Sequence, residues 1–162
     1  MEKRESAGKE GSAVCTYDAV DRRYEYLDHT ADIKVHAWGD TVELAYCASA
    51  VGMIGCITEI DTVKVDSSLG ELSISARGHD LPSLLFSFLD EVLFLFHTQL
   101  FLTRKLVIKR SHLDPTSELQ LEADAYGEAF DLGRHPQGIE VKAVTFNAMQ
   151  IEKKPNGEHH VE

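Results

Sequence analysis

The sequence predicts an α+β fold, a sandwich in which two helices pack on one face of a mostly antiparallel sheet. Three observations support this fold class. Two segments, near residues 40–56 and 80–97, repeat apolar residues at helical spacing, and a hairpin pattern lies between them. Four segments with strand-like character follow the second helix, and consecutive strands usually pair antiparallel through short connections.

The length and composition fit one folded domain with a loose segment at each end. The chain has 162 residues, of which 43% are hydrophobic, and this is enough to bury a core. Residues 1–20 are rich in Gly, Ser, Ala and charge, so we expect a flexible N-terminal tail there. Residues 21–154 are expected to form the single domain, and residues 155–162 a C-terminal tail.

Two short strands are expected on either side of an acidic loop. Residues 24–27 are rich in β-forming side chains, and the run IKVHAWG at 33–39 alternates apolar and polar residues. The loop between them, DHTAD, is typical of an ordinary turn. However, two carboxylates held about 4 Å apart repel by roughly 4 kcal/mol at an effective dielectric near 20. Their close approach would need a cation, N–H donors or a shared proton, so a plain turn and a functional site both stay open.

The first helix is expected to begin with Asp40 as N-cap, because Glu43 three residues later completes a capping-box pattern. We expect it to end near Cys56. Gly52 and Gly55 would let another element approach its last turns closely.

A hairpin is expected from residues 62–65 and 71–77, which flank the turn DSSLG. The second helix should begin after Asp80 as N-cap, with Pro82 in the first turn, where its missing N–H does no harm. Apolar residues cover almost its whole circumference, which predicts a central core helix. The strands expected after it are residues 102–109, 118–128, 139–146 and 147–153.

Charge and motif content argue against several function classes. There are 27 acidic and 16 basic residues, and the net charge of −11 disfavours strong direct binding of nucleic acid. The glycines form no nucleotide-binding loop, and the histidines lack zinc-site spacing. The apolar run at 84–96 is interrupted by polar residues and is too short to span a membrane. Three cysteines without C-x-x-C spacing or a signal peptide predict a reducing compartment, the cytoplasm or the nucleus.

A hard divalent cation is the candidate ligand of the acidic loop, because Ca²⁺, Mg²⁺ and Mn²⁺ prefer carboxylate and carbonyl oxygens. The loop lacks the spacing of an EF-hand and cannot fill a coordination shell by itself. Any cation site would therefore need further ligands from distant strands.

Four separated blocks of the sequence resemble the archease family. They are YEYLDHTADIKVHAWGDTVELAY, GHDLPSLLFSFLDEVL, YGEAFD and HPQGIEVKAVTFNAMQI, and they stand in one order between residues 23 and 151. The resemblance implies a small α+β protein that is not itself the catalyst. It implies an accessory factor that acts on the RtcB-type RNA ligase and its tRNA-splicing complex. Such a factor promotes guanylylation of the ligase and its multiple turnover.

The resemblance also implies a metal site. Asp32, the last acid of DHTAD, matches the family's metal-binding aspartate, and the implied ion is Ca²⁺ first, with Mg²⁺ or Mn²⁺ as alternatives. Archeases usually finish with an apolar strand and a final acidic residue, whose carboxylate and the C-terminal carboxylate complete the site. This chain stops at PNGEHHVE, so we expect a shortened or variant ending and an incomplete site. The candidate neighbours of Asp32 are Asp28, His29 and Glu162.

A second set of residues is implied in activating the partner. Lys142 of the run EVKA matches a family position implicated in activation. Its candidate neighbours by sequence are Glu128, His135 and Glu140.

Two other functions stay open at the level of the sequence. A metal-dependent hydrolase could use Asp32 to hold the ion and His29 or His135 as the base. A chaperone-like module could bind partners through exposed apolar surface around the second helix. The hypothesis that this chain activates a ligase assigns no catalytic residue to it.

Overall fold

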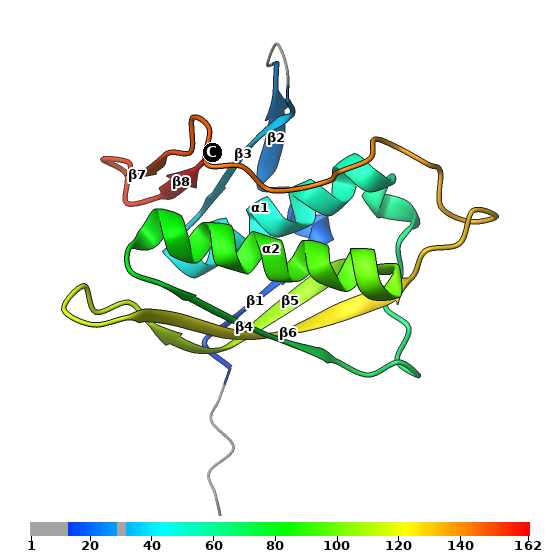
Figure 1. Cartoon of the computed structure of the whole chain (residues 1–162), viewed down its shortest axis with the longest axis horizontal. Coiled ribbons are helices and arrows are strands. Elements are labelled where there is room, and N and C mark those ends of the chain that lie inside the picture. Colours follow the sequence, from blue (N-terminus) through cyan, green and yellow to red (C-terminus); the bar gives the residue numbers. More distant parts are fainter. Residues whose placement is uncertain (1–12, 29–31) are drawn as a thin grey trace, which may run out of the picture.

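Two long helices and two four-stranded sheets make up the fold, which confirms the predicted α+β class (Figure 1). The computed structural model describes residues 13–28 and 32–162. The strand order is β1-β5-β6-β4 in the first sheet and β2-β3-β8-β7 in the second, and every pairing among the described strands is antiparallel. The β strands therefore divide between two sheets, and the helices lie between them (Figure 1).

The first sheet is built around the long hairpin of β5 and β6. Alternate residues of β6 are buried, which is the period of a strand with one face on a core. Register shifts after Thr103 and Ile108 interrupt the ladder and mark points where a strand bends. The strands are β1 (Cys15–Asp18), β4 (Leu72–Gly78), β5 (Phe101–His112) and β6 (Leu119–Ala129).

The second sheet is smaller and covers the other side of the first helix. Ala37 of β3 lies opposite Val161 of β8, and both side chains are buried. Both strands contact helix α1. The strands are β2 (Tyr24–Leu27), β3 (Lys34–Gly39), β7 (Ile151–Lys153) and β8 (His159–Val161).

Helix α1 (Val42–Ile57) is buried on almost every side because it lies between the two sheets. Gly52 is needed for this close packing: a Cβ added there would come within 2.9 Å of Val35 Cγ1 and 3.0 Å of the Tyr24 ring. The helix ends one residue after Cys56, as the sequence predicted.

The N-cap of α1 is Thr41, and the prediction of Asp40 is wrong. The Thr41 hydroxyl accepts a hydrogen bond from the Leu44 N–H at 3.2 Å. The Asp40 carboxylate lies 3.2 Å from the Arg23 guanidinium and makes an exposed ion pair there. Two adjacent polar residues can both serve as a cap, and this distant arginine favours the second of them.

Helix α2 (Leu81–Gln99) begins as predicted. Asp80 accepts from the Ser83 N–H at 2.8 Å, and Ser83 accepts in return from the Asp80 N–H at 3.1 Å. Pro82 stands in the first turn. The helix ends at Gln99, and the φ of 52° at the following residue, Leu100, lies in the left-handed region that stops a helix.

By length and composition alone, α2 could cross a membrane. The core helix of a globular domain passes the same test. Leu84, Phe88 and Val92 are fully buried, and the helix contacts β4, β5, β6 and α1. The packing therefore accounts for its apolar character and agrees with the predicted core helix.

The predicted hairpin of residues 62–65 and 71–77 is wrong. β4 pairs with β6 along its whole length, and residues 60–62 form a short 3₁₀ helix, η2 (Ile60–Thr62). Residues 62–65 have no partner strand in the described part of the chain, and side chains from the first sheet form hydrogen bonds with their backbone instead. The Arg104 guanidinium donates to the Val63 carbonyl at 2.7 Å, and Glu128 accepts from the Lys64 N–H at 2.8 Å.

Both predicted tails contain ordered strands, which corrects the domain boundaries. β1 lies within residues 1–20, pairs with β5 and buries Tyr17; a 3₁₀ helix, η1 (Ala19–Asp21), follows it. Residues 1–12 lie outside the described part of the chain. β8 lies within residues 155–162 and pairs with both β3 and β7. Strands of three or four residues carry little local signal, and their pairing depends on the neighbours that the fold provides.

The predicted strand at residues 139–146 is wrong, and only 151–153 of the predicted strand at 147–153 pairs in a sheet. We call residues 132–150 the connecting segment. It runs along the two helices towards β7 (Figure 1). The Gly138 N–H donates to the Ile57 carbonyl and the Ile139 N–H to the Cys56 carbonyl, each at 2.8 Å. The first part of the segment is thus held by the end of α1.

Candidate functional site

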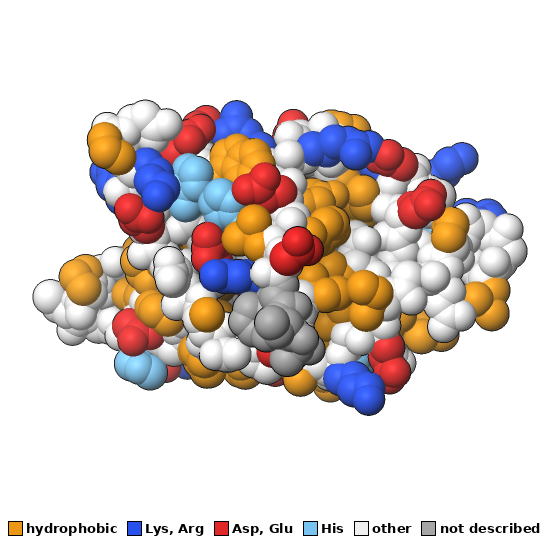
Figure 2. Space-filling model, turned by 90° about the horizontal axis from the view of Figure 1, so that it is seen from above, with side chains coloured by type: hydrophobic (Ala, Val, Ile, Leu, Met, Phe, Trp, Pro, Cys, Tyr) orange, Lys and Arg blue, Asp and Glu red, His pale blue; other side chains and the backbone are white. Residues whose placement is uncertain are grey.

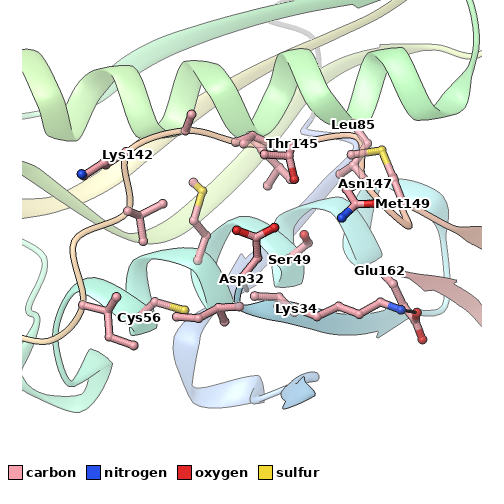
Figure 3. A pocket seen from close by; sticks show the side chains of 18 of the residues that line it. Asp32, Lys34, Ser49, Cys56, Leu85, Lys142, Thr145, Asn147, Met149 and Glu162 are labelled. Carbon is pink, nitrogen blue, oxygen red and sulfur yellow. Dashed lines mark ion pairs between the residues drawn. The ribbon is translucent and has the colours of Figure 1, made fainter. Parts of the chain in front are cut away.

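A pocket of about 620 Å³ lies where β3, α1, α2 and the connecting segment meet (Figure 3). Its apolar lining includes Met53 of α1, Leu85 and Leu89 of α2, and Val141 and Val144 of the connecting segment. The predicted site residues Asp32, Glu140, Lys142 and Glu162 also line it. Segments that are far apart in the sequence therefore bring four of the predicted residues to one cavity.

Asp32 stands just before β3 and is exposed. Its carboxylate points into the pocket, above Ser49 of α1 and towards the connecting segment (Figure 3). An exposed charge at the end of a strand is well placed to meet a ligand or a partner.

Glu162 has a partner within the chain. Its carboxylate lies 2.5 Å from the Lys34 ammonium, and only about a quarter of each side chain is exposed (Figure 3). Lys34 and Glu162 therefore neutralise each other at one end of the pocket, and the carboxylate is already engaged by a cation of the chain itself.

Lys142 and Glu140 reach the pocket from the connecting segment. The Lys142 amino group points away from the Asp32 carboxylate, so these two predicted residues line one pocket without forming a pair (Figure 3). Within the described residues, Lys142 makes no ion pair. Its charge is therefore directed outward, where an approaching molecule would meet it.

Glu128 and His135, the other two residues predicted with Lys142 for partner activation, do not line the pocket. Glu128 is buried at the end of β6, and His135 is fully buried beside it. The His135 Nε2–H donates to Glu128 at 2.8 Å, while His135 Nδ1 accepts from the Asp131 N–H at 2.9 Å. The tight turn at 131–135 brings the two together and keeps both away from the surface.

The environment of Glu128 favours its ionised form. Burial alone would raise the pKa of this carboxyl group, but hydrogen bonds from the Lys64 N–H, His135 and Arg134 outweigh burial and lower the pKa. The Arg134 guanidinium contributes the positive charge, at 2.9 Å. The cluster joins β6 to the start of the connecting segment.

Two further residues, Asp28 and His29, were predicted as neighbours of Asp32. Asp28 is exposed at the end of β2 and does not line it. His29 lies outside the described residues.

The donor atoms described in the pocket do not make a complete site for a hard cation. Ca²⁺ takes about six to eight oxygens. Asp32 and Glu140 supply one carboxylate each, whereas Glu162 is paired with Lys34. Across residues 13–28 and 32–162, no three His, Cys, Asp or Glu side chains converge in a way that could hold a metal ion.

Comparison with known families decides what kind of protein carries this pocket. The family model described as Archease protein family (MTH1598/TM1083) matches residues 24–161, which include both helices and every residue of the pocket lining except Glu162. The chain belongs to the archease family. Within it, "Protein archease-like" of Drosophila melanogaster is 47% identical over 130 residues, 80% of this chain and 80% of that protein.

Other archeases are similar over most of their length. "Protein archease" of Ictalurus punctatus is 44% identical over 83% of this chain and 80% of that protein. The archease of Pyrococcus furiosus is 37% identical over 84% of this chain and 92% of that protein. The solution structure of Methanobacterium thermoautotrophicum protein 1598 superposes with a TM-score of 0.68 at 30% identity, covering 86% of this chain and 94% of that one.

Sequence reasoning missed several polar residues of this archease pocket. Lys34 could have been predicted, because residues two positions apart in an extended chain point to the same side, and Lys34 stands two positions after Asp32. Ser49 on α1 gave no such signal, since a serine inside an apolar helix is usually structural. Asn147 reaches the pocket from an irregular segment, which has no periodicity that could predict its direction.

Proposed function

We propose that this archease is a non-catalytic accessory factor that activates an RtcB-type RNA ligase in tRNA splicing. In this proposal it promotes guanylylation of the ligase, so that each ligase molecule completes several rounds. The observation that supports the proposal is one pocket lined by both Asp32 and Lys142, the two residues matched to the family's functional positions, which come from distant parts of the chain.

The chemistry of the pocket is better suited to binding than to catalysis. Its thiol, Cys56, is partly buried, and burial raises the pKa of that group more than its hydrogen bond with Tyr26 lowers it. A protonated thiol is a poor nucleophile. The pocket combines an apolar lining with outward-facing charges, which is the usual composition of a docking site.

Activation of a partner requires preference for one of its states. A factor that binds both ligase conformations equally shifts nothing, whatever its affinity. Contacts of Asp32 and Lys142 with the ligase would therefore have to form in the GTP-accepting state and be lost in the other. The net charge of −11 would complement the basic surface expected of an enzyme that binds RNA, and would speed the encounter.

A divalent cation is a separate part of the proposal. Asp32 would hold Ca²⁺, or Mg²⁺ or Mn²⁺, with water or the partner supplying the ligands that the described residues lack. Calorimetry with each ion checks this part: heat that disappears in Asp32→Asn supports it, and identical heats in wild type and Asp32→Asn contradict it. In our proposal, activation of the ligase does not depend on this ion.

Multiple-turnover ligation tests the proposed function. Limiting ligase, excess tRNA exon halves and GTP are mixed with or without this chain, and joined product is counted per ligase. The proposal predicts more than one product per ligase only when the chain is present. An unchanged number of turnovers would show that the proposal is wrong.

The hydrolase alternative loses one of its two candidate bases. His135 is fully buried and both of its ring nitrogens are hydrogen-bonded, so it cannot reach a substrate water. The chaperone-like alternative keeps some support from Phe94 of α2 and Phe146 of the connecting segment, each about half exposed. Pull-down separates it from the activator: binding to unrelated unfolded proteins but not to the ligase would favour the chaperone.

We place this function in the cytoplasm or the nucleus, where tRNA splicing and a reducing environment coincide. The cysteines are free thiols in the described part of the chain, which is compatible with this placement.

A further inference from the structure

A second group of polar side chains lies on the face of the second sheet that points away from α1. His36 and Trp38 of β3 and His160 of β8 occupy this face, since the intervening Ala37 and Val161 are buried against the helix. None of the three lines the pocket. Histidine side chains gather beside acidic ones on the surface seen in Figure 2.

The two imidazoles face each other through one nitrogen each. His36 Nε2 lies 2.9 Å from His160 Nδ1. The other nitrogen of each ring contacts a carboxylate: His36 Nδ1 lies 2.8 Å from Glu25, and His160 Nε2 lies 3.3 Å from Glu158. The four side chains therefore form one continuous line across β2, β3 and the β7–β8 hairpin.

The two carboxylates favour one placement of the hydrogens. An ionised carboxylate only accepts hydrogen bonds, so both contacts are hydrogen bonds when His36 Nδ1 and His160 Nε2 carry the hydrogens. If both imidazoles are neutral, the two facing nitrogens then carry no hydrogen, and each directs a lone pair at the other. Two lone pairs at 2.9 Å repel unless a cation lies between them, and that cation is either a proton or a metal ion.

The arrangement has the features of a metal site whose ligands are already oriented. Histidines that bind a metal usually donate their second N–H to a carboxylate, which fixes the ring and raises its basicity. Both His36 and His160 have such a carboxylate. Nitrogens about 2.05 Å from one ion lie about 2.9 Å apart at a right angle and about 3.3 Å apart in a tetrahedron. The observed 2.9 Å fits the right angle.

We propose that His36 and His160 bind one transition-metal ion that prefers tetragonal geometry, Cu²⁺ or Ni²⁺, with water in the remaining positions. Imidazole is a favoured ligand of both ions, and tetragonal coordination, in which neighbouring ligands stand at right angles, is typical of them. About a fifth of each imidazole is exposed, so an ion and its water can reach the site. The site rests on neither the ligase proposal nor the pocket.

Trp38 gives the site a built-in reporter. It is the only tryptophan of the chain, and its ring lies 5.4 Å from that of His36 and 6.2 Å from that of His160, centroid to centroid. Cu²⁺ and Ni²⁺ quench indole fluorescence at such distances. A titration can therefore follow an ion that binds between these two rings.

Titration of the full chain with CuCl₂ and NiCl₂, followed by Trp38 fluorescence and by calorimetry, tests the proposal. The wild type should bind one ion with quenching. His36→Ala and His160→Ala should each abolish the quenching and the corresponding heat, because each removes one of two protein ligands. Glu25→Gln keeps both ligands and should weaken binding by about 10–100-fold. His36→Gln repeats the first test with a similar side-chain volume.

His159→Ala and His112→Ala are the matched controls, since both histidines lie outside the dyad. They should bind with wild-type affinity, and circular dichroism should show that all variants are folded. Quenching that survives in folded His36→Ala and His160→Ala would overturn the proposal. A wild type that binds neither ion would also overturn it, and would leave a shared proton between the two rings.

Discussion

At the scale of single residues, the buried carboxylate Glu128 has a structural role. It accepts from a backbone N–H, a buried histidine and an arginine, and these donors come from two different stretches of chain. A buried charge is tolerated only when it is satisfied in this way. We therefore interpret Glu128 and His135 as the anchor of the connecting segment rather than as contacts with a partner.

Glu128→Gln should destabilise the protein by about 2–3 kcal/mol, because hydrogen bonds to a charged acceptor are worth about 1.5–3 kcal/mol each and the amide turns a donor towards other donors. Urea unfolding measures the difference. The control is Glu122→Gln on the same strand, whose contact with Arg110 is exposed at 3.7 Å and should cost less than about 0.5 kcal/mol. Equal effects of the two changes would contradict the anchor role.

The stability contributed by Glu128 should depend on pH. Its pKa in the folded protein lies below the ordinary value, so the folded state favours the carboxylate. The contribution is complete above the unfolded-state pKa of about 4.3 and is lost as pH falls through the lower folded-state pKa. Urea titrations from pH 7 to 3 should show the gap between wild type and Glu128→Gln closing only below about pH 4.3. A gap that stays constant over this range would count against the assignment.

The sequence predicted some of these residues through local pattern and family resemblance, and missed the contacts that depend on the fold. Asp32 and Lys142 could be named because they stand in recognisable blocks. The pairing of Glu128 with His135 could not, since it depends on a turn that places them in the interior. The ion pair of Lys34 with Glu162 could not be predicted either, because the two residues are far apart in the sequence and only the fold brings them together.

At the scale of elements, helices were predictable because their caps and periodicity are local. Both helices lie where the sequence placed them. The strands were less predictable: residues 62–65 lack a ladder because Arg104 and Glu128 satisfy their backbone groups instead. β1 and β8 are ordered because long-range neighbours pair with them, which no local pattern reveals.

The sequence and the structure assign different N-cap residues to α1, Asp40 and Thr41 respectively. Thr41→Ala should cost about 1 kcal/mol of unfolding free energy, because it leaves the Leu44 N–H without its acceptor. Asp40→Ala should cost less than about 0.5 kcal/mol, since it removes only an exposed ion pair with Arg23. Thermal or urea unfolding of the two variants decides, and a larger loss for Asp40→Ala would restore the original capping prediction.

At the scale of the whole molecule, the fold brings Asp32 and Lys142 to one face through segments more than a hundred residues apart. The acidic overall charge and this pocket together support a partner-binding protein. The pocket is enclosed by the connecting segment, so the irregular part of the chain is also the part that carries Lys142.

Charge changes in the pocket should reduce activation while the fold is kept. Asp32→Asn and Lys142→Ala should each weaken the stimulation of ligase turnover by about tenfold or more, the effect of losing roughly 1.4 kcal/mol of contact energy. Asp90→Asn on α2 and Lys153→Ala on β7 are exposed controls of the same residue types and should stimulate as the wild type does. A loss that is equal in the controls would point to net charge rather than to the pocket.

The most direct measurement is the rate at which spent ligase is guanylylated again. Ligase that has completed one round is mixed with labelled GTP, and covalent label on the ligase is followed with time. Our account predicts that wild-type chain accelerates labelling and that Asp32→Asn and Lys142→Ala do not. Labelling at the same rate with and without the wild-type chain would contradict it.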